Sequence, residues 1–97
     1  MEAALKALSD PGRRRILTLV RDEERSAGEI AAEFTVTWPA ISQHLRVLKE
    51  AGLVTERRDG ARRLYRARPE GLREVRAFLD AFWDDRLEQL KREVERG

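Results

Sequence analysis

Six arginines and one acidic residue lie within a short stretch near the middle of the chain. Of all the residues in the sequence, these most clearly indicate a kind of chemistry. The arginines are Arg57, Arg58, Arg62, Arg63, Arg66 and Arg68, and the acid is Asp59. Because the 97-residue chain has a formal net charge of only +2, this positive charge is a local feature. A local basic patch predicts a polyanionic partner, such as nucleic acid.

The basic stretch has the pattern of a β-hairpin. Residues 53–58 and 61–68 are rich in strand-forming side chains and flank Asp59-Gly60, a strong hairpin signal. With a two-residue turn there, the expected facing pairs are Val54 with Tyr65, Glu56 with Arg63, and Arg57 with Arg62. The like-charged last pair indicates phosphates as the missing counterions. The alternative is a solvated edge strand whose arginines prevent aggregation.

A polar helix surface is predicted directly before the hairpin. Ile41, Leu45 and Leu48 repeat at helical spacing and face the core, so the other side of the helix faces outward. There Gln43 could pair with adenine and Arg46 with guanine or phosphate. The candidate DNA contacts are Thr37, Trp38, Pro39, Ala40, Ser42, Gln43, His44, Arg46 and Lys49 on this helix, and Arg57, Arg58, Arg62 and Arg63 on the hairpin.

Two of these residues have alternative interpretations. His44 has an intermediate helical angle, so it either contacts DNA or packs at the edge of the core with one ring nitrogen bonded to the backbone. Trp38, at the helix start, either leans on the phosphate backbone or staples the turn.

Local start and stop signals place the remaining elements. A short helix is expected over residues 1–8, and Asp10-Pro11 begins the next helix, with Ile16, Leu17, Leu19 and Val20 as its buried stripe. Ser26 and Glu29 have the spacing of a capping box for a third helix that runs through Phe34. Thr37 can cap the fourth helix, and Gly52 ends it.

From residue 70 to 96 the sequence predicts a long amphipathic helix. We interpret its aromatic residues, Phe78, Phe82 and Trp83, as packing surface; the alternative is an effector pocket. We interpret its acidic run, Asp80, Asp84, Asp85 and Glu88, as a solvated face with paired basic residues; the alternative is cation binding. A small domain gains stability from an obligate dimer interface.

Composition excludes several classes of protein. The chain has no cysteine and one histidine, so thiolate ligands, disulfides and thiol chemistry are absent and metal binding is not expected. No catalytic motif is present, and we expect neither an enzyme nor a cofactor. No apolar run is long enough for a membrane span, and Met1-Glu2 opens without a signal peptide, which predicts a cytoplasmic protein without a membrane partner.

Two segments resemble the ArsR family of bacterial winged helix-turn-helix repressors. They are residues 7–17, ALSDPGRRRIL, and residues 38–54, WPAISQHLRVLKEAGLV. The resemblance covers almost the whole chain and implies a homodimer built from the first and last helices, with a recognition helix at about 37–51. The cysteine and histidine sites of metal-sensing members are missing here. The releasing signal stays open: a small molecule, a partner protein, or the protein's own abundance.

These observations together predict a single mainly α (α+β) domain over residues 1–97. It is a winged helix-turn-helix with about five helices and one β-hairpin wing. The expected function is a homodimeric repressor that occludes a promoter at a pseudo-palindromic operator on double-stranded DNA. The alternatives are a protein-interaction module without DNA binding and, third, an enzyme subunit or small-molecule carrier. Residues 1–8 and 70–96 are expected to form the dimer interface, with Leu5, Leu8, Leu72, Val75, Leu79, Phe82, Trp83, Leu87 and Leu90.

Overall fold

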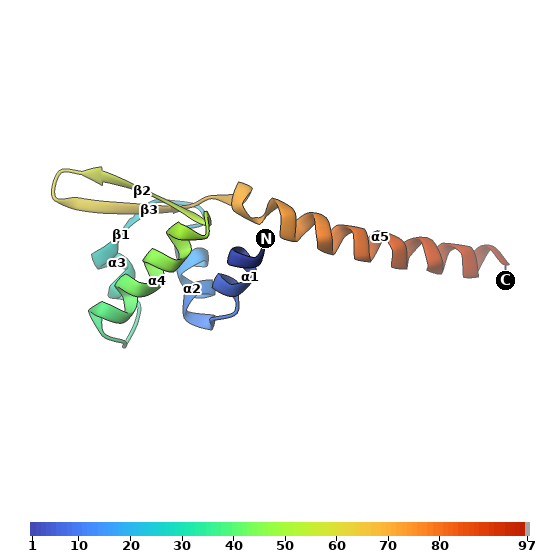
Figure 1. Cartoon of the computed structure of the whole chain (residues 1–97), viewed down its shortest axis with the longest axis horizontal. Helices are drawn as coiled ribbons and strands as arrows, with labels where there is room; N and C mark the ends of the chain where they lie inside the picture. Colours follow the sequence, from blue (N-terminus) through green and yellow to red (C-terminus); the bar gives the residue numbers. More distant parts are fainter. Residues whose placement is uncertain (97) are drawn as a thin grey trace.

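The computed structural model describes residues 1–96 of the chain, so residue 97 of the predicted domain lies outside it. The elements in chain order are α1 (Glu2–Leu8), α2 (Pro11–Leu19), β1 (Arg25–Ser26), α3 (Ala27–Ala31), α4 (Trp38–Glu50), β2 (Val54–Asp59), β3 (Arg62–Ala67), the 3₁₀ turn η1 (Pro69–Leu72) and α5 (Arg73–Arg96). Figure 1 shows the short helices gathered below a small sheet, with α5 projecting to one side. The predicted winged helix-turn-helix is confirmed.

The predicted capping signals at two helix starts are confirmed. Asp10 accepts a hydrogen bond from the backbone N–H of Arg13 at 3.0 Å, and Pro11 occupies the first turn of α2. Ser26 and Glu29 form the reciprocal capping box of α3, with both hydrogen bonds at 3.1 Å. Thr37 is the N-cap residue of α4, but its side chain makes no capping hydrogen bond.

The core lies between α2, α3 and α4. Its largest fully buried side chains are Ile16, Val20, Ile30, Ile41, Leu48 and Leu53. Burial of each such side chain contributes about 1.5–3 kcal/mol of transfer free energy. The predicted stripe on α4 is confirmed, and Gly52 ends the helix with a φ of +74°. The core therefore fixes which face of α4 points outward.

The sheet has three antiparallel strands in the order β1-β3-β2. β1 was not predicted because a two-residue strand has no periodic pattern. In the wing, which we define as residues 54–67, the predicted register is wrong. Asp59 faces Arg62 and Arg58 faces Arg63, so the turn residues are Gly60-Ala61. Gly60 has a φ of +64°, and none of the described non-glycine residues, Ala61 included, has a positive φ, which is the pattern of a type II′ turn.

The error in register is two residues, so each wing side chain keeps its predicted face of the hairpin. Its opposite neighbour changes, however. Arg57 faces Leu64, and the like-charged pair is Arg58 with Arg63. A like-charged cross-strand pair was therefore expected correctly, but at the wrong residues.

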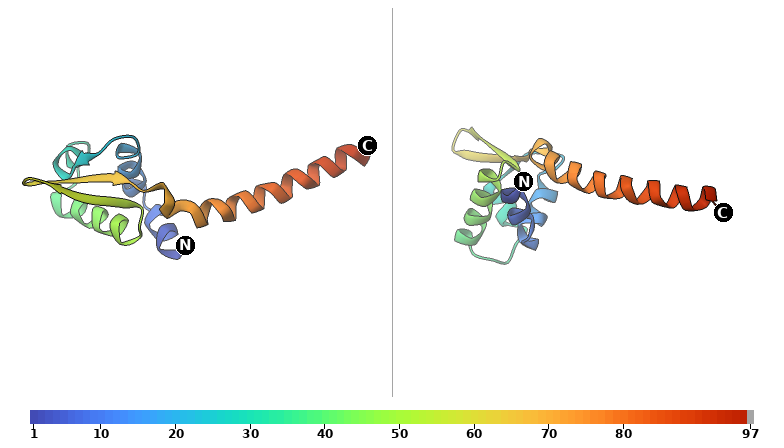
Figure 2. Two further views of the ribbon diagram at one scale, coloured as in Figure 1. Left: turned by 90° about the horizontal axis from the view of Figure 1, so that it is seen from above. Right: turned by 45° about the vertical axis from the view of Figure 1, so that its right-hand side comes forward.

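Helix α5 leaves the rest of the molecule soon after it begins. The molecule measures 64 × 25 × 22 Å, and the two views in Figure 2 show α5 extending away from the other elements. Leu72 and Val75 pack against the core, whereas farther along the helix Phe82 and Trp83 are 68% and 61% exposed. None of the described helices is long and apolar enough to cross a membrane. The apolar stripe of α5 is therefore left open to water.

Candidate nucleic-acid interface

The outward face of α4 presents the predicted polar residues to solvent. Pro39, Ser42, Gln43, Arg46 and Lys49 are exposed, and Ala40 is half-buried. Thr37 and Trp38, at the start of the helix, are also exposed, and 55% of Trp38 is accessible. Arg46 donates a hydrogen bond to Oε1 of Gln43 at 3.2 Å. This bond orients the Gln43 amide on a surface that can meet base edges.

His44 lies apart from that surface, against the start of α2. Its Nε2 is 3.7 Å from Oδ2 of Asp10, and its Nδ1 is 3.4 Å from a guanidinium nitrogen of Arg13. The Arg13 backbone N–H lowers the pKa of Asp10, and the charges of His44 and Arg13 lower it further. Arg13 also donates to the carbonyls of Lys6 and Ala7. This geometry places His44 at the edge of the core, as in the alternative interpretation, but its ring nitrogens face the side chains of Asp10 and Arg13 and not the backbone.

Two wing arginines are paired with acids far away in the sequence. Arg57 donates two hydrogen bonds to Glu24, both at 2.7 Å, and Arg62 donates one to Glu29 at 2.7 Å. Hydrogen bonding to Arg57 lowers the pKa of Glu24 and raises that of Arg57. The pKa of Glu29 is lowered chiefly by Ser26, with Arg62 adding to the effect. Neither acid was singled out from the sequence as a wing partner.

A polar pocket of about 220 Å³ separates α4 from the wing. It is lined by Ser42, Leu45, Arg46, Lys49, Glu56, Arg63 and Tyr65. The Glu56 carboxylate accepts a hydrogen bond from Tyr65 at 3.1 Å and lies 3.4 Å from Nζ of Lys49 and 4.0 Å from Nε of Arg63. Burial and this hydrogen bond raise the pKa of Tyr65. Glu56 thus anchors cations from both elements.

Sequence reasoning did not assign a role in the site to Glu56 or Tyr65. The available signal was weak: Glu56 is one acid among arginines, and a strand pattern shows only which face it occupies. The contact with Lys49 depends on how α4 packs against β2, which the local sequence does not specify.

The residues predicted for a dimer interface divide into two groups. Leu8, Leu72 and Val75 pack against the core of their own chain. The others expose large apolar side chains: Leu5, Leu79, Phe82, Trp83, Leu87 and Leu90. The ends of α1 and α5 are close, since the amino group of Met1 lies 3.4 Å from Glu74. The two helices therefore begin close to each other.

The acidic run on α5 forms no metal site among the residues whose side chains are described. Asp80 pairs with Arg76 at 3.4 Å. The side chains of Asp84 and Asp85 lie outside the described part. Within that part, no group of three or more histidine, aspartate or glutamate side chains could hold a metal ion.

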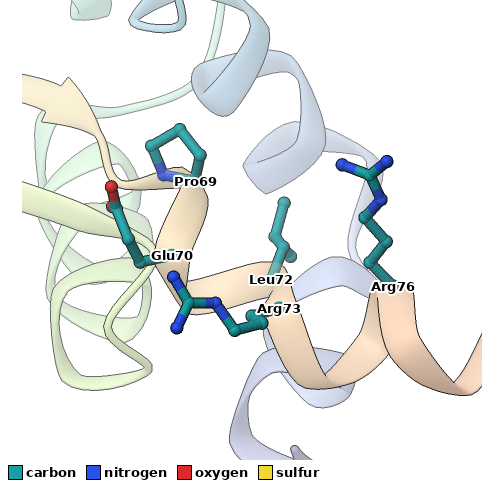
Figure 3. Close-up of a pocket in the computed structure, with 5 residues that line it drawn as sticks. All are labelled: Pro69, Glu70, Leu72, Arg73 and Arg76. Carbon is teal, nitrogen blue, oxygen red and sulfur yellow. The ribbon is translucent and has the colours of Figure 1, made fainter.

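A hollow of about 390 Å³ lies where η1 meets α5, and Figure 3 shows its lining residues, Pro69, Glu70, Leu72, Arg73 and Arg76. All five come from η1 and the first turns of α5. The hollow is therefore separate from the surface formed by α4 and the wing.

Known proteins resemble the chain in both sequence and structure. A family model described as bacterial regulatory protein, arsR family, matches residues 10–56. The HTH-type transcriptional regulator Rv2034 of Mycobacterium tuberculosis is 44% identical over 82 residues, which cover 84% of this chain and 77% of that protein. The transcriptional repressor SdpR of Bacillus subtilis is 43% identical over 60 residues, which cover 62% of this chain and 67% of that protein.

A solved structure has the same fold. It is the homodimeric winged helix-turn-helix DNA-binding domain of Mb0332 from Mycobacterium bovis, described as a possible ArsR-family transcriptional regulator. It matches with a TM-score of 0.68 and 32% identity, covering 87% of this chain and 78% of that one.

Proposed function

The chain belongs to the arsR family of bacterial regulatory proteins and is a DNA-binding transcriptional regulator, and we propose that it acts as a homodimeric repressor. In this proposal the single domain binds a pseudo-palindromic operator and blocks the promoter without performing chemistry. It works in the bacterial cytoplasm, where the DNA is. The homodimeric state of Mb0332 supports the proposed dimer. The description of SdpR as a transcriptional repressor supports the proposed repression.

The main observation that supports a dimer is that the apolar stripe of α5 is exposed to water. Within the described part of the chain, nothing covers Leu79, Phe82, Trp83, Leu87 or Leu90. Burial of five such side chains would contribute on the order of 10 kcal/mol before the entropic costs of association. The same stripe on a second copy is the partner proposed here, because a two-fold axis lets one surface complement itself.

Such a dimer would present two copies of α4 to DNA. Each α4 would enter a major groove, and half-sites about 34–36 Å apart, or a multiple of that distance, would match the two-fold axis. Gln43, oriented by Arg46, would read adenine through paired hydrogen bonds. The exposed N-terminus of α4, with Thr37 and Trp38, would contact the phosphate backbone. Thus α4 supplies sequence preference and the wing supplies affinity.

The decisive experiment is selection of fragments from the source genome that the full chain retains, followed by fluorescence anisotropy titration at two salt concentrations. We expect a pseudo-palindromic motif, a dissociation constant between about 10⁻⁸ and 10⁻¹¹ M, and random duplex bound about 10³-fold or more weakly. Light scattering should give the mass of a dimer. Failure to bind duplex DNA even at low salt would contradict the proposal and favour a protein-interaction module.

A further inference from the structure

The two faces of the wing carry arginines in different environments. We propose that Arg57 and Arg62 clamp the wing to the start of α3 and do not contact DNA. In the same proposal, Arg58 and Arg63 each bind a separate backbone phosphate beside the pocket next to α4. The inference rests on the proposed function, since it assigns roles within the same DNA-binding surface.

Side-chain alternation separates the four arginines into two pairs. Arg57 and Arg62 share a face with Leu64, whereas Arg58 and Arg63 share the opposite face with Tyr65. Arg57 contacts Glu24 and Arg62 contacts Glu29, so the first face lies toward the start of α3. Tyr65 lines the pocket that borders α4, so the second face lies toward the proposed DNA-reading helix.

The positive charges of the first pair, Arg57 and Arg62, are already neutralised by acidic side chains. Arg57 holds Glu24 through two parallel hydrogen bonds, the geometry in which a guanidinium binds a carboxylate best. Arg62 binds Glu29, whose carboxylate is also fixed by the backbone N–H of Ser26. To reach a phosphate, either arginine would have to leave its acid and expose that carboxylate to the phosphate charge. Contact with DNA through these arginines is therefore disfavoured.

The second pair lacks such compensation. Arg58 faces the like-charged Arg63 and forms no ion pair with any residue in the described part of the chain. Arg63 has only a loose contact with Glu56, at 4.0 Å, and that carboxylate is shared with Tyr65 and Lys49. The pocket lining contains three cations and one acid, so its formal charge is +2. A singly charged DNA phosphate would relieve the repulsion there.

The clamps also explain how the wing could be held at a fixed distance from α4. A two-stranded hairpin is marginally stable by itself. Glu24 and Glu29 lie on either side of the β1–α3 junction, and α3 packs into the same core as α4 through Ile30 and Ile41. The two ion pairs therefore tie one wing face to the body that positions α4. Loss of a clamp should disturb the fit to the operator without removing a phosphate contact.

The test is the salt dependence of operator binding by the full-length dimer. Each phosphate contact contributes about 0.9 to the slope of log K against log salt concentration. Arg58→Gln and Arg63→Gln should each reduce the magnitude of the slope by about 1.8, because both protomers lose a contact. Arg57→Gln and Arg62→Gln should weaken operator binding several-fold and leave the slope unchanged. Circular dichroism and light scattering should first establish that each variant is folded and dimeric.

A charge swap provides the matched control. Arg57→Glu should weaken binding, and the double variant Glu24→Arg/Arg57→Glu should restore it, because the ion pair is rebuilt with the same net charge as the wild type. If the double variant stays as weak as Arg57→Glu, or if Arg57→Gln lowers the slope as Arg58→Gln does, the proposed division is wrong. Failure of the wild type to prefer its operator would instead refute the proposed function.

Discussion

Gly71→Ala is the substitution for which the structure gives the sharpest expectation. Gly71 is in η1, directly before α5. A Cβ atom added there would lie 2.1 Å from the carbonyl oxygen of Gly52 and 3.1 Å from Cδ2 of Leu53. Leu53 is fully buried, and its carbonyl accepts the backbone N–H of Arg68 at 2.8 Å. Neither neighbour can move without disturbing the core or the η1 connection.

The size of the effect follows from this overlap. Because Cβ contacts under 3.0 Å are essentially not tolerated, η1 must move by about 1 Å, and overpacking of this kind typically costs about 1–3 kcal/mol. A 1 Å shift over η1, which is about 8 Å long, turns α5 by about 7°. The far end of a helix about 36 Å long then moves by about 4–5 Å. We therefore expect lower stability and a distorted proposed dimer.

The assay is urea unfolding followed by circular dichroism at a fixed protein concentration, since dimer stability depends on concentration. Gly28→Ala is the matched control, because the nearest atom to its added Cβ is Oγ of Ser26 at 3.9 Å. Within α3 this change should stabilise the protein by about 0.5–1 kcal/mol. Equal unfolding free energies for the two variants would refute the close approach of η1 to Gly52.

Three further predictions concern the helices. Gln43→Ala should cost about 1–3 kcal/mol on the operator and nothing on random duplex in anisotropy titrations; equal losses would remove its role in base reading. Phe82→Glu should give monomers by light scattering, whereas an unchanged mass would show that the dimer interface does not include Phe82. The Arg13 N–H lowers the pKa of Asp10 in the folded protein below its usual value of 3.8. The stability that the Asp10 carboxylate gives the folded state is therefore complete above about pH 4 and is lost as the pH falls through the pKa of folded Asp10. In urea unfolding between pH 6 and 3, Asp10→Asn should flatten this acid-side decline, and an identical profile would contradict the cap.

Short-range signals were enough to predict most of the helical framework. The caps at Asp10 and Ser26 involve residues three apart, so the sequence contains both partners of each interaction. The apolar spacing on α4 sets its buried face, and Gly52 supplies the backbone conformation that ends it. The third helix is shorter than predicted and ends at Ala31, and Phe34 packs against the core from beyond its end.

The hairpin shows the limit of local reasoning. Asp59-Gly60 predicted a turn, and Gly60 does supply the positive φ, but the turn begins one residue later than expected. Two alignments that differ by two residues place the same side chains on the same faces, so hydrophobic patterning does not choose between them. Pairing of Leu64 and Tyr65 with the unpredicted β1 is a tertiary interaction that accompanies the observed register.

By itself, the sequence determined the helix starts, the buried stripe of α4 and the concentration of arginine in the wing, because each depends on residues within a turn or strand of one another. Only the tertiary structure decided what those arginines meet. Glu24 and Glu29 are each 33 residues from their arginine partners, and Lys49 reaches Glu56 only because α4 packs beside the wing. The number of charged residues can be read from the sequence. Which acidic side chain pairs with which arginine depends on the elements that the core brings together.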